Sequence, residues 1–197
     1  MATHLVLASA SPARLAALRR AGFDPDVVVS GVDESHAVGT AYEVALALAI
    51  AKARAVAKDA ADSLVVGCDS VLDLDGVAYG KPNDAAEAVR RWHLMRSRSA
   101  VLHTGHCVID TATEREVAEI ASTTVHFADV SDDEIEAYVA TGEPLRVAGA
   151  FTIDGVGGSF VDKIEGDPHN VVGISLPLLR RLFRLLDVTV PSLWVQT

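Results

Sequence analysis

The segment 65–82, VVGCDSVLDLDGVAYGKP, carries three aspartates that could do chemistry, namely Asp69, Asp73 and Asp75. Asp69 follows an apolar run typical of a strand buried on both faces, and ligand sites in open sheets often lie at the carboxyl ends of strands. Asp73 and Asp75 form a D-x-D-G pattern, which could supply an aspartate nucleophile and a second acid. Asp75-Gly76 is also a strong hairpin-turn pair. We favour chemistry at Asp69 and a turn at Asp75-Gly76, with the D-x-D reading as the alternative.

The segment SASPAR, residues 9–14, has the composition of an anion cradle. Ser11 is a good helix N-cap and Pro12 suits the first helical position. A helix N-terminus offers free N–H groups and a positive dipole end to an anion, and Ser9, Ser11 and Arg14 add further donors. The alternative is that the segment is simply a well-capped helix start.

Two lysines stand apart from the rest of the chain. Lys52 lies midway through an alanine-rich apolar helix, and Lys81 follows a glycine in YGKPND, between the hairpin and the next helix. Either ammonium could neutralise a phosphate, although most lysines are solvated surface residues.

Carboxylates complete the set of chemical groups. Glu34, next to Asp33, lies at a strand–loop junction, as Asp69 does. Two carboxylates near an anion cradle are the usual way to hold Mg²⁺ or Mn²⁺ against a phosphate. The alternative is that Asp33 and Glu34 are solvated loop residues and that Asp69 caps a turn.

The elements that must position these residues alternate between helices and strands. Helices are expected from Ser11-Pro12 to Gly22 and over 41–60, 84–96, 132–140 and 175–186; strands are expected over 4–8, 26–30, 63–70, 99–110 and 116–128; and a glycine-rich β segment is expected over 147–168. This pattern indicates an α/β or α+β fold with no clean boundary, and hence a single domain over 1–197.

The composition of the chain excludes several classes of function. The chain has 197 residues, half of them hydrophobic, and a formal net charge of −10. The acidic balance disfavours nucleic-acid binding. The apolar runs stay far short of the ~18 residues of a membrane span, and the N-terminus does not resemble a signal peptide. Cys68 and Cys107 lie in apolar strand-like contexts and favour a reducing compartment, so a cytoplasmic protein without membrane association is expected.

The order of these motifs resembles the Maf family of nucleoside triphosphate pyrophosphatases. The resemblance rests on SASPAR, V-D-E near 33, the helix lysine, CDS, YGKP, VAGAF and KIEGDPHNVVGISLP, and it covers about residues 4 to 185. It implies an α/β fold related to inosine triphosphatase, with a mixed central sheet, flanking helices and two lobes around a deep cleft. It also implies hydrolysis of a nucleoside triphosphate to the monophosphate and pyrophosphate, with Mg²⁺ or Mn²⁺, and suggests a homodimer. The D-x-D-G match to haloacid-dehalogenase-type phosphatases is only local.

The resemblance gives the matching residues expected roles. Ser9, Ser11 and Arg14 would cradle the phosphates, Lys52 and Lys81 would neutralise them, Glu34 and Asp69 would hold the metal, and Asp69 would accept the proton of the attacking water.

Departures from the family pattern bear on the substrate. Most members carry two consecutive arginines in the first loop, whereas this chain has Ala13-Arg14-Leu15, so one phosphate contact is missing. Pyrimidine-preferring members have a lysine and a glutamine where this chain has Val147 and Asp154. An acidic residue suits a guanine edge or a cationic methylated base, whereas glutamine suits uracil or thymine. We therefore expect Asp154 to recognise the base of a modified purine such as 7-methyl-GTP. The alternatives are a UTP or dTTP pyrophosphatase and a non-catalytic nucleotide-binding regulator of cell division.

Overall fold

The computed structural model describes residues 4–34 and 36–195. The strands are β1 (His4–Leu7), β2 (Asp26–Val27), β3 (Ser63–Leu74), β4 (Val77–Tyr79), β5 (Ser99–Asp110), β6 (Arg115–Phe127) and β7 (Val161–Glu165). The α-helices are α1 (Pro12–Arg20), α2 (Ala41–Ala57), α3 (Ala85–Met95), α4 (Asp132–Ala140), α5 (Pro168–Val172) and α6 (Leu176–Leu185), and the short 3₁₀ helices are η1 (Pro144–Arg146), η2 (Ala148–Ala150), η3 (Val156–Phe160) and η4 (Val190–Leu193).

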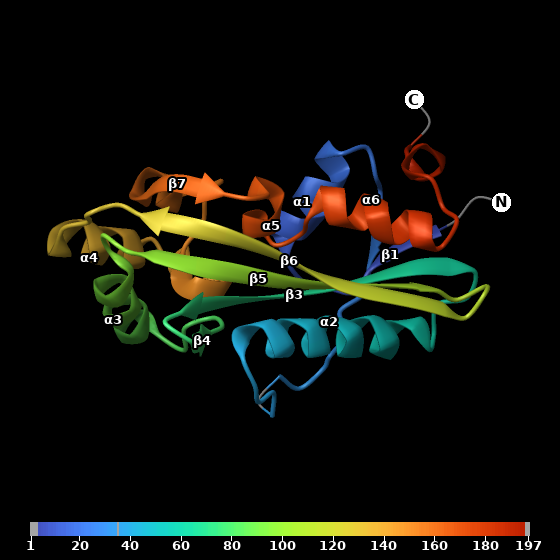
Figure 1. Ribbon diagram of the computed structural model, residues 1–197, viewed down its shortest axis with the longest axis horizontal. Helices are drawn as coiled ribbons and strands as arrows, with labels where there is room; N and C mark the ends of the chain where they lie inside the picture. Colours follow the sequence, from blue (N-terminus) through green and yellow to red (C-terminus); the bar gives the residue numbers. More distant parts are fainter. Residues whose placement is uncertain (1–3, 35, 196–197) are drawn as a thin grey trace.

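All seven strands form one sheet in the order β2-β1-β3-β5-β6-β7, with β4 paired to β3 outside this path. β1 runs parallel to β2 and β3, and the remaining pairs are antiparallel. Helix α2 lies along one face of the long strands, and helices α1, α5 and α6 cover the other face (Figure 1). Helices α3 and α4 lie at the end of the sheet that is away from the two chain termini. The expected α/β fold with a mixed sheet and flanking helices is confirmed.

Two glycines let α2 approach the sheet very closely. A Cβ added at Gly67 of β3 would lie 2.7 Å from the Ala53 amide nitrogen and closer still to the Ala49 carbonyl oxygen. A Cβ at Gly105 of β5 would likewise meet the α2 backbone at Ala45. Since backbone atoms cannot move aside cheaply, these two positions require glycine for a geometric reason.

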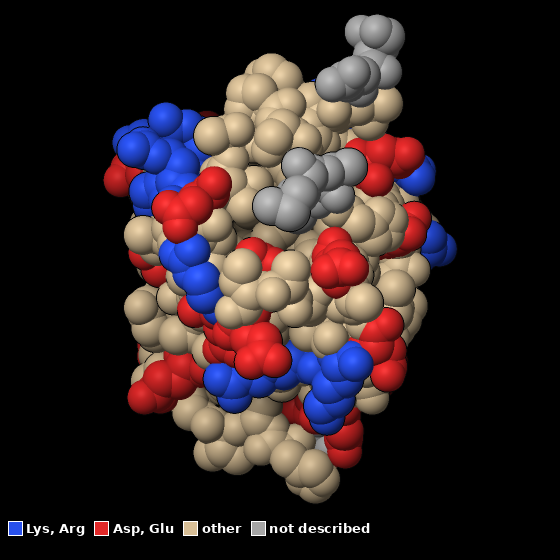
Figure 2. Space-filling model, turned by 90° about the vertical axis from the view of Figure 1, so that its right-hand side faces the viewer, with Lys and Arg blue, Asp and Glu red and all other residues tan. Residues whose placement is uncertain are grey.

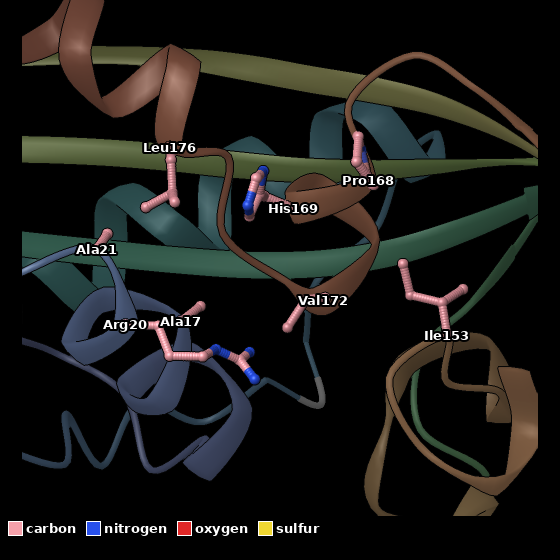
Figure 3. A pocket seen from close by; sticks show the side chains of 8 residues that line it. All are labelled: Ala17, Arg20, Ala21, Ile153, Pro168, His169, Val172 and Leu176. Carbon is pink, nitrogen blue, oxygen red and sulfur yellow. The ribbon is translucent and has the colours of Figure 1, made fainter.

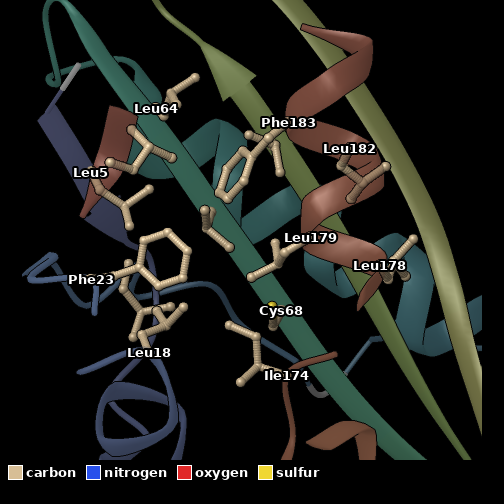
Figure 4. Close-up of a cluster of buried hydrophobic side chains, with 14 of the residues drawn as sticks. Leu5, Leu18, Phe23, Leu64, Cys68, Ile174, Leu178, Leu179, Leu182 and Phe183 are labelled. Atoms are coloured by element: carbon tan, nitrogen blue, oxygen red, sulfur yellow. The ribbon is translucent and has the colours of Figure 1, made fainter. Parts of the chain in front are cut away.

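The opposite face of β3 packs on a hydrophobic cluster formed with α1 and α6. Cys68 belongs to this cluster and lies near Ile174 and the α6 side chain Leu179 (Figure 4). Because neighbouring residues of a strand point to opposite faces, Gly67 and Asp69 face α2, and Cys68 and Ser70 face α1 and α6. The cysteine prediction is confirmed in part: Cys68 and Cys107 are both buried and free.

Helix starts follow the capping residues of the sequence. The Ser11 hydroxyl accepts the amide N–H of Arg14, as expected of an N-cap. Thr40 and Glu43 have the sequence spacing of a capping box, and they form one at the start of α2. Because capping involves only residues three apart, the sequence alone was enough to predict these starts.

Two strand predictions are confirmed only in part. Of the strand expected over 26–30, only Asp26–Val27 pairs with β1. The glycine-rich segment 147–168 is mostly a series of 3₁₀ turns, and only Val161–Glu165 is a strand. Gly149 has a φ of 71° and Ala150 a φ of 61°, and these left-handed residues break any extended path there.

Charged side chains of both signs are interspersed over the end of the molecule seen in Figure 2. Arg54 of α2 pairs with Glu116 of β6 at 2.7 Å, and Arg115 of β6 pairs with Asp187 after α6 at 2.6 Å. These pairs connect the β5–β6 hairpin to the helices on both faces. Within the residues that the structure describes, no helix is long and apolar enough to cross a membrane.

Candidate active site

The candidate site lies at a break in the pairing along one edge of β3. β1 pairs with β3 as far as Val66, and β4 pairs with it from Leu72 onward. β5 occupies the opposite edge throughout, so residues 67–71 have no strand partner on the β1 side within the described chain. The loop after β1 approaches this opening from one end, and the chain leaving β4 approaches it from the other. Asp69 lies in the middle of the opening. The prediction that it ends its strand was wrong, because β3 continues past residue 70 to Leu74.

A buried ammonium joins two carboxylates at this opening. Lys52 of α2 places its Nζ 2.5 Å from Asp69 Oδ1 and 2.6 Å from Glu34 Oε1. The side chains of Lys52 and Asp69 are each only 10% exposed, whereas that of Glu34 is 53% exposed. The sequence identified all three residues, but it did not predict that Lys52 would pair with both carboxylates.

Burial changes the acidity of Asp69. Loss of solvent raises the pKa of its carboxyl above the usual range, although the charges of Lys52 and Arg14 and a hydrogen bond from Lys52 lower it in part. A carboxylate whose pKa is shifted toward neutrality is a better proton acceptor than an ordinary surface aspartate. Asp69 is therefore suited to general-base chemistry.

Arg14 and Ser9 line the adjacent side of the opening. The Arg14 guanidinium donates to the Gly173 carbonyl at 2.8 Å, to the Cys68 carbonyl at 2.9 Å, to Ser9 Oγ at 3.0 Å and to Ser70 Oγ at 3.1 Å. These bonds use four of its five N–H groups, which leaves one for a ligand. Arg14 thus holds the loop after β1, β3 and the α5–α6 turn together, a role that the sequence did not reveal.

Ser9 and Ser11 form the loop from β1 to α1. Ser9 is buried, and its Oγ accepts the Ser11 amide N–H at 3.2 Å as well as the Arg14 guanidinium. Its hydroxyl hydrogen remains available to an acceptor in the opening. The Ser11 hydroxyl is used as the α1 N-cap. The alternative that this segment is a well-capped helix start is thus confirmed. The prediction that the segment also cradles phosphates is compatible with this geometry.

Lys81 lies on the opposite side of the opening. The antiparallel pairing of Tyr79 with Leu72 directs the chain after β4 back toward Ser70 and Asp69. Its side chain forms no hydrogen bond or ion pair with the described residues. The structure therefore places the Lys81 backbone beside the site and leaves its ammonium free for a ligand, while the predicted role in phosphate neutralisation stays a prediction.

Arg91 of α3 fixes that backbone, and nothing in the sequence pattern singled it out. It is 7% exposed, donates to the Gly80 carbonyl at 2.5 Å and to the Lys81 carbonyl at 3.4 Å, and pairs with Glu87. Its guanidinium also stacks on Tyr79, 5.2 Å from the ring centroid. In the sequence, the only feature that could have indicated this role is that Arg91 is a basic residue on the buried face of an amphipathic helix.

The other two aspartates of the segment serve the hairpin. Asp73 accepts the Gly76 amide N–H at 2.7 Å, and Asp75 pairs with Arg98. Asp75 has a φ of 55° and Gly76 a φ of 80°, which is the left-handed geometry of a tight hairpin turn. The predicted turn is confirmed. The Asp73 carboxylate has its partner within the turn, and the Asp75 carboxylate pairs with Arg98 just before β5.

Asp154 is exposed, in the segment between η2 and η3, and Glu143 holds this segment in place. The Glu143 carboxylate accepts from Thr152 at 2.6 Å, Tyr138 at 2.9 Å, and the amides of Val156 and Gly157 at 3.0 Å each. Partial burial would raise the pKa of Glu143, but these hydrogen bonds together lower it to about 2. Glu143 was also missed by the sequence analysis.

The carboxylates of Glu34 and Asp69 fit part of a divalent-metal site. Their oxygens converge on one point, which the Lys52 ammonium occupies. Mg²⁺ commonly binds to one or two carboxylates and completes its shell with water and substrate phosphates. Among the described residues, no group of three or more His, Cys, Asp or Glu could hold an ion. The two carboxylates are therefore compatible with a metal that arrives with a phosphate ligand.

Comparison with models of known protein families shows the family to which this chain belongs. The family model of the Maf-like proteins matches residues 4–186, which include every element of the site. This chain belongs to the Maf family. The resemblance of the SASPAR, CDS and YGKP motifs is thereby confirmed.

Relatives of this Maf-like chain carry a common name. A Salinispora tropica protein named nucleoside triphosphate pyrophosphatase is 61% identical over 197 residues, covering 97% of this chain and 87% of that protein. A Streptomyces coelicolor protein of the same name is 59% identical over 194 residues, covering 97% and 94%. A Nocardia farcinica protein, also of that name, is 54% identical over 208 residues, with 98% coverage of both chains.

Proposed function

We propose that this Maf-like protein hydrolyses a nucleoside triphosphate to the monophosphate and pyrophosphate. The observation that carries the proposal is the buried Lys52–Asp69 pair in the unpaired edge of β3, with Ser9 and Arg14 on one side and Lys81 on the other. The names of relatives that are 54–61% identical support the same activity.

In the proposed reaction, water attacks the α-phosphorus and pyrophosphate leaves. Asp69 accepts the proton of the attacking water, for which its raised pKa suits it. Lys52 and Lys81 balance the charge that shifts to the leaving oxygen, and Ser9, Ser11 and Arg14 orient the phosphates. One water is consumed, the α–β phosphoanhydride bond breaks, and a proton is released.

We also propose Glu34 and Asp69 as the carboxylates that hold Mg²⁺ or Mn²⁺ with the substrate. A bound divalent ion would supply additional neutralisation of the triphosphate. Since Lys52 lies between these carboxylates, its ammonium would shift toward the phosphates when the ion enters. Titration of metal binding with and without a nucleotide tests this, because two carboxylates alone predict weak binding in the absence of phosphate.

For the base, we propose a modified purine such as that of 7-methyl-GTP, with Asp154 as the recognising residue. The support is the acidic side chain at a position where pyrimidine-preferring members have glutamine. Rates of pyrophosphate release from 7-methyl-GTP, GTP, UTP and dTTP test the preference. A clear preference for UTP or dTTP would contradict it.

The activity itself is tested by product analysis together with two matched aspartate variants. We expect pyrophosphate, with no inorganic phosphate, from the wild type, and a loss of at least about 10²-fold in kcat/KM for Asp69→Asn. Asp73→Asn, in the same strand, is expected to retain the rate because its carboxylate serves the turn. Inorganic phosphate as product, with Asp73 essential and Asp69 dispensable, would instead establish a D-x-D phosphatase.

A further inference from the structure

A pocket of about 320 Å³ opens between α1, α5 and the segment after η2. Its walls are mostly apolar, formed by Ala17, Ala21, Ile153, Pro168, Val172 and Leu176, and its polar members are Arg20 and His169. Figure 3 shows the Arg20 side chain extending from α1 toward Val172. This cavity has apolar walls and one unpaired guanidinium, which is the composition of a site for a flat polar ring.

The pocket adjoins the candidate active site through shared segments. On α1, Arg14 binds the opening at β3, and Ala17, one turn later, lines the pocket. At the end of α5, the Gly173 carbonyl accepts from Arg14, and the preceding Val172 lines the pocket.

The segment around η2 makes the same connection from the other side. The Gly149 amide donates to the Gly80 carbonyl at 3.0 Å, next to Lys81. Ile153, four residues later, lines the pocket, and the exposed Asp154 follows it. Three chain segments therefore each border the opening at one residue and the pocket at a nearby one.

The spacing along α1 matches the length of a nucleoside. Ala13, Ala17 and Arg20 follow one another at i, i+4 and i+7, so they share one face of the helix. Ala13 lies in the first turn, beside the serine loop, and Arg20 lies about 10 Å farther along the axis. On this face the small side chain of Ala17 lines the pocket, and Arg20 lines its far end.

Taking the proposed function as given, we propose that this pocket receives the nucleobase of the substrate and that Arg20 is a specificity-determining residue for a 6-oxopurine. The Arg20 guanidinium is exposed and has no hydrogen bond or ion pair with the described residues, so it can donate to O6 of the base. The apolar walls would cover the ring faces, and Asp154, which follows the lining residue Ile153 in the chain, would accept from the N1–H edge.

The test compares Arg20→Met with Arg19→Met. Arg19 is the next residue on the same helix, is exposed and pairs with Asp24 at 3.3 Å, so it serves as the matched control. The probes are GMP, which has the base and one phosphate, and inorganic tripolyphosphate, which has no base. Binding of each probe to the full-length protein with Mg²⁺ is measured by calorimetry.

We expect Arg20→Met to weaken GMP binding by about 10- to 100-fold, as loss of a good arginine–guanine contact does, and to leave tripolyphosphate binding unchanged. Arg19→Met should change neither. Equal weakening of both probes would make Arg20 a phosphate ligand and overturn the proposal. Unchanged GMP binding in Arg20→Met, or no GMP binding by the wild type, would overturn it as well.

This result is separable from the proposed activity. Pyrophosphate release from GTP is measured on the same wild-type sample. A protein that binds GMP through Arg20 but releases no pyrophosphate from any nucleotide would refute the proposed function and retain the base pocket. Pyrophosphate release that is insensitive to Arg20→Met in both KM and kcat would retain the function and refute the pocket.

Discussion

The Lys52 ammonium lies between Asp69 and Glu34, 2.5 Å from an oxygen of the first and 2.6 Å from an oxygen of the second. It comes from the middle of a helix whose backbone almost touches the strand that carries Asp69. One cation thus compensates a buried and a half-exposed carboxylate before any substrate binds. This arrangement keeps Asp69 charged in a place where burial favours its neutral form.

Replacing Lys52 should cost stability as well as activity. Lys52→Met leaves the Asp69 carboxylate buried without its nearest cation, and breaking one partner of a buried pair typically costs about 3 kcal/mol or more. We expect the free energy of unfolding, measured in urea, to fall by about that amount. The double variant Lys52→Met, Asp69→Asn should recover most of the stability and none of the activity. Equal stability of Lys52→Met and wild type would mean that the pair contributes nothing to the fold.

Arg91 should act on catalysis through Lys81. Its hydrogen bonds reach the carbonyls of Gly80 and Lys81, so Arg91→Met should lower kcat/KM by about 10-fold through misplacement of the lysine. A double-mutant cycle with Lys81→Ala measures the coupling. The Arg91 effect should largely vanish once Lys81 is alanine.

A variant on the same helix controls for structural damage. Arg96 also lies at α3 and donates to the Val130 carbonyl and to Asp132, away from the opening. Arg96→Met is expected to lower stability slightly and to leave kcat/KM unchanged. Additive effects of Arg91→Met and Lys81→Ala would show that Arg91 serves only the fold.

Gly67 should be intolerant of a single methyl group. The Cβ of Gly67→Ala would overlap the α2 backbone at Ala49, and the helix would have to move away from β3. We expect a loss of at least about 2 kcal/mol, an upper-range cost for overpacking, together with reduced turnover because Lys52 moves with the helix. Gly80→Ala is the control, since nothing lies within 4 Å of its added Cβ. Similar melting temperatures for the two variants would contradict the close approach.

Glu143 should contribute a pH-dependent part of the stability. Its pKa is lowered from 4.5 to about 2 in the folded protein, so its contribution is fully present above about pH 4.5 and is lost as the pH falls toward 2. After a discount for partial solvent screening, the contribution of Glu143 to the free energy of unfolding is on the order of 1–2 kcal/mol. Glu143→Gln should be less stable than wild type at pH 7 and should lose less stability between pH 4.5 and 2. Parallel pH curves for the two proteins would exclude this role.

The sequence was sufficient where structure depends on near neighbours. The caps at Ser11 and Thr40 and the turn at Asp75 were predicted correctly, because each rests on residues within three positions. The strand expected over 147–168 failed because residues outside it, above all Glu143, hold it in turns. Long-range hydrogen bonds of this kind leave no local pattern.

The same limit applies to the site. Sequence motifs identified Ser9, Lys52 and Asp69 as candidate site residues, yet the ion pair between Lys52 and Asp69 joins residues 17 positions apart, and no local pattern predicts it. Arg14 was expected to face a phosphate, and most of its donors instead hold the protein together. The contacts of Arg91 with the Gly80 and Lys81 backbone were not predicted, because their acceptors are carbonyl oxygens, which every residue has.

The unpaired edge of β3 also bears on how copies of this protein avoid one another. An open strand edge is a template for strands of other molecules. Here the opening is short, it is closed by a loop and a hairpin at its two ends, and Arg14 already occupies the Cys68 carbonyl within it. We therefore expect the Arg14 guanidinium to oppose strand pairing between molecules, and Arg14→Ala to increase light scattering at high protein concentration even without nucleotide.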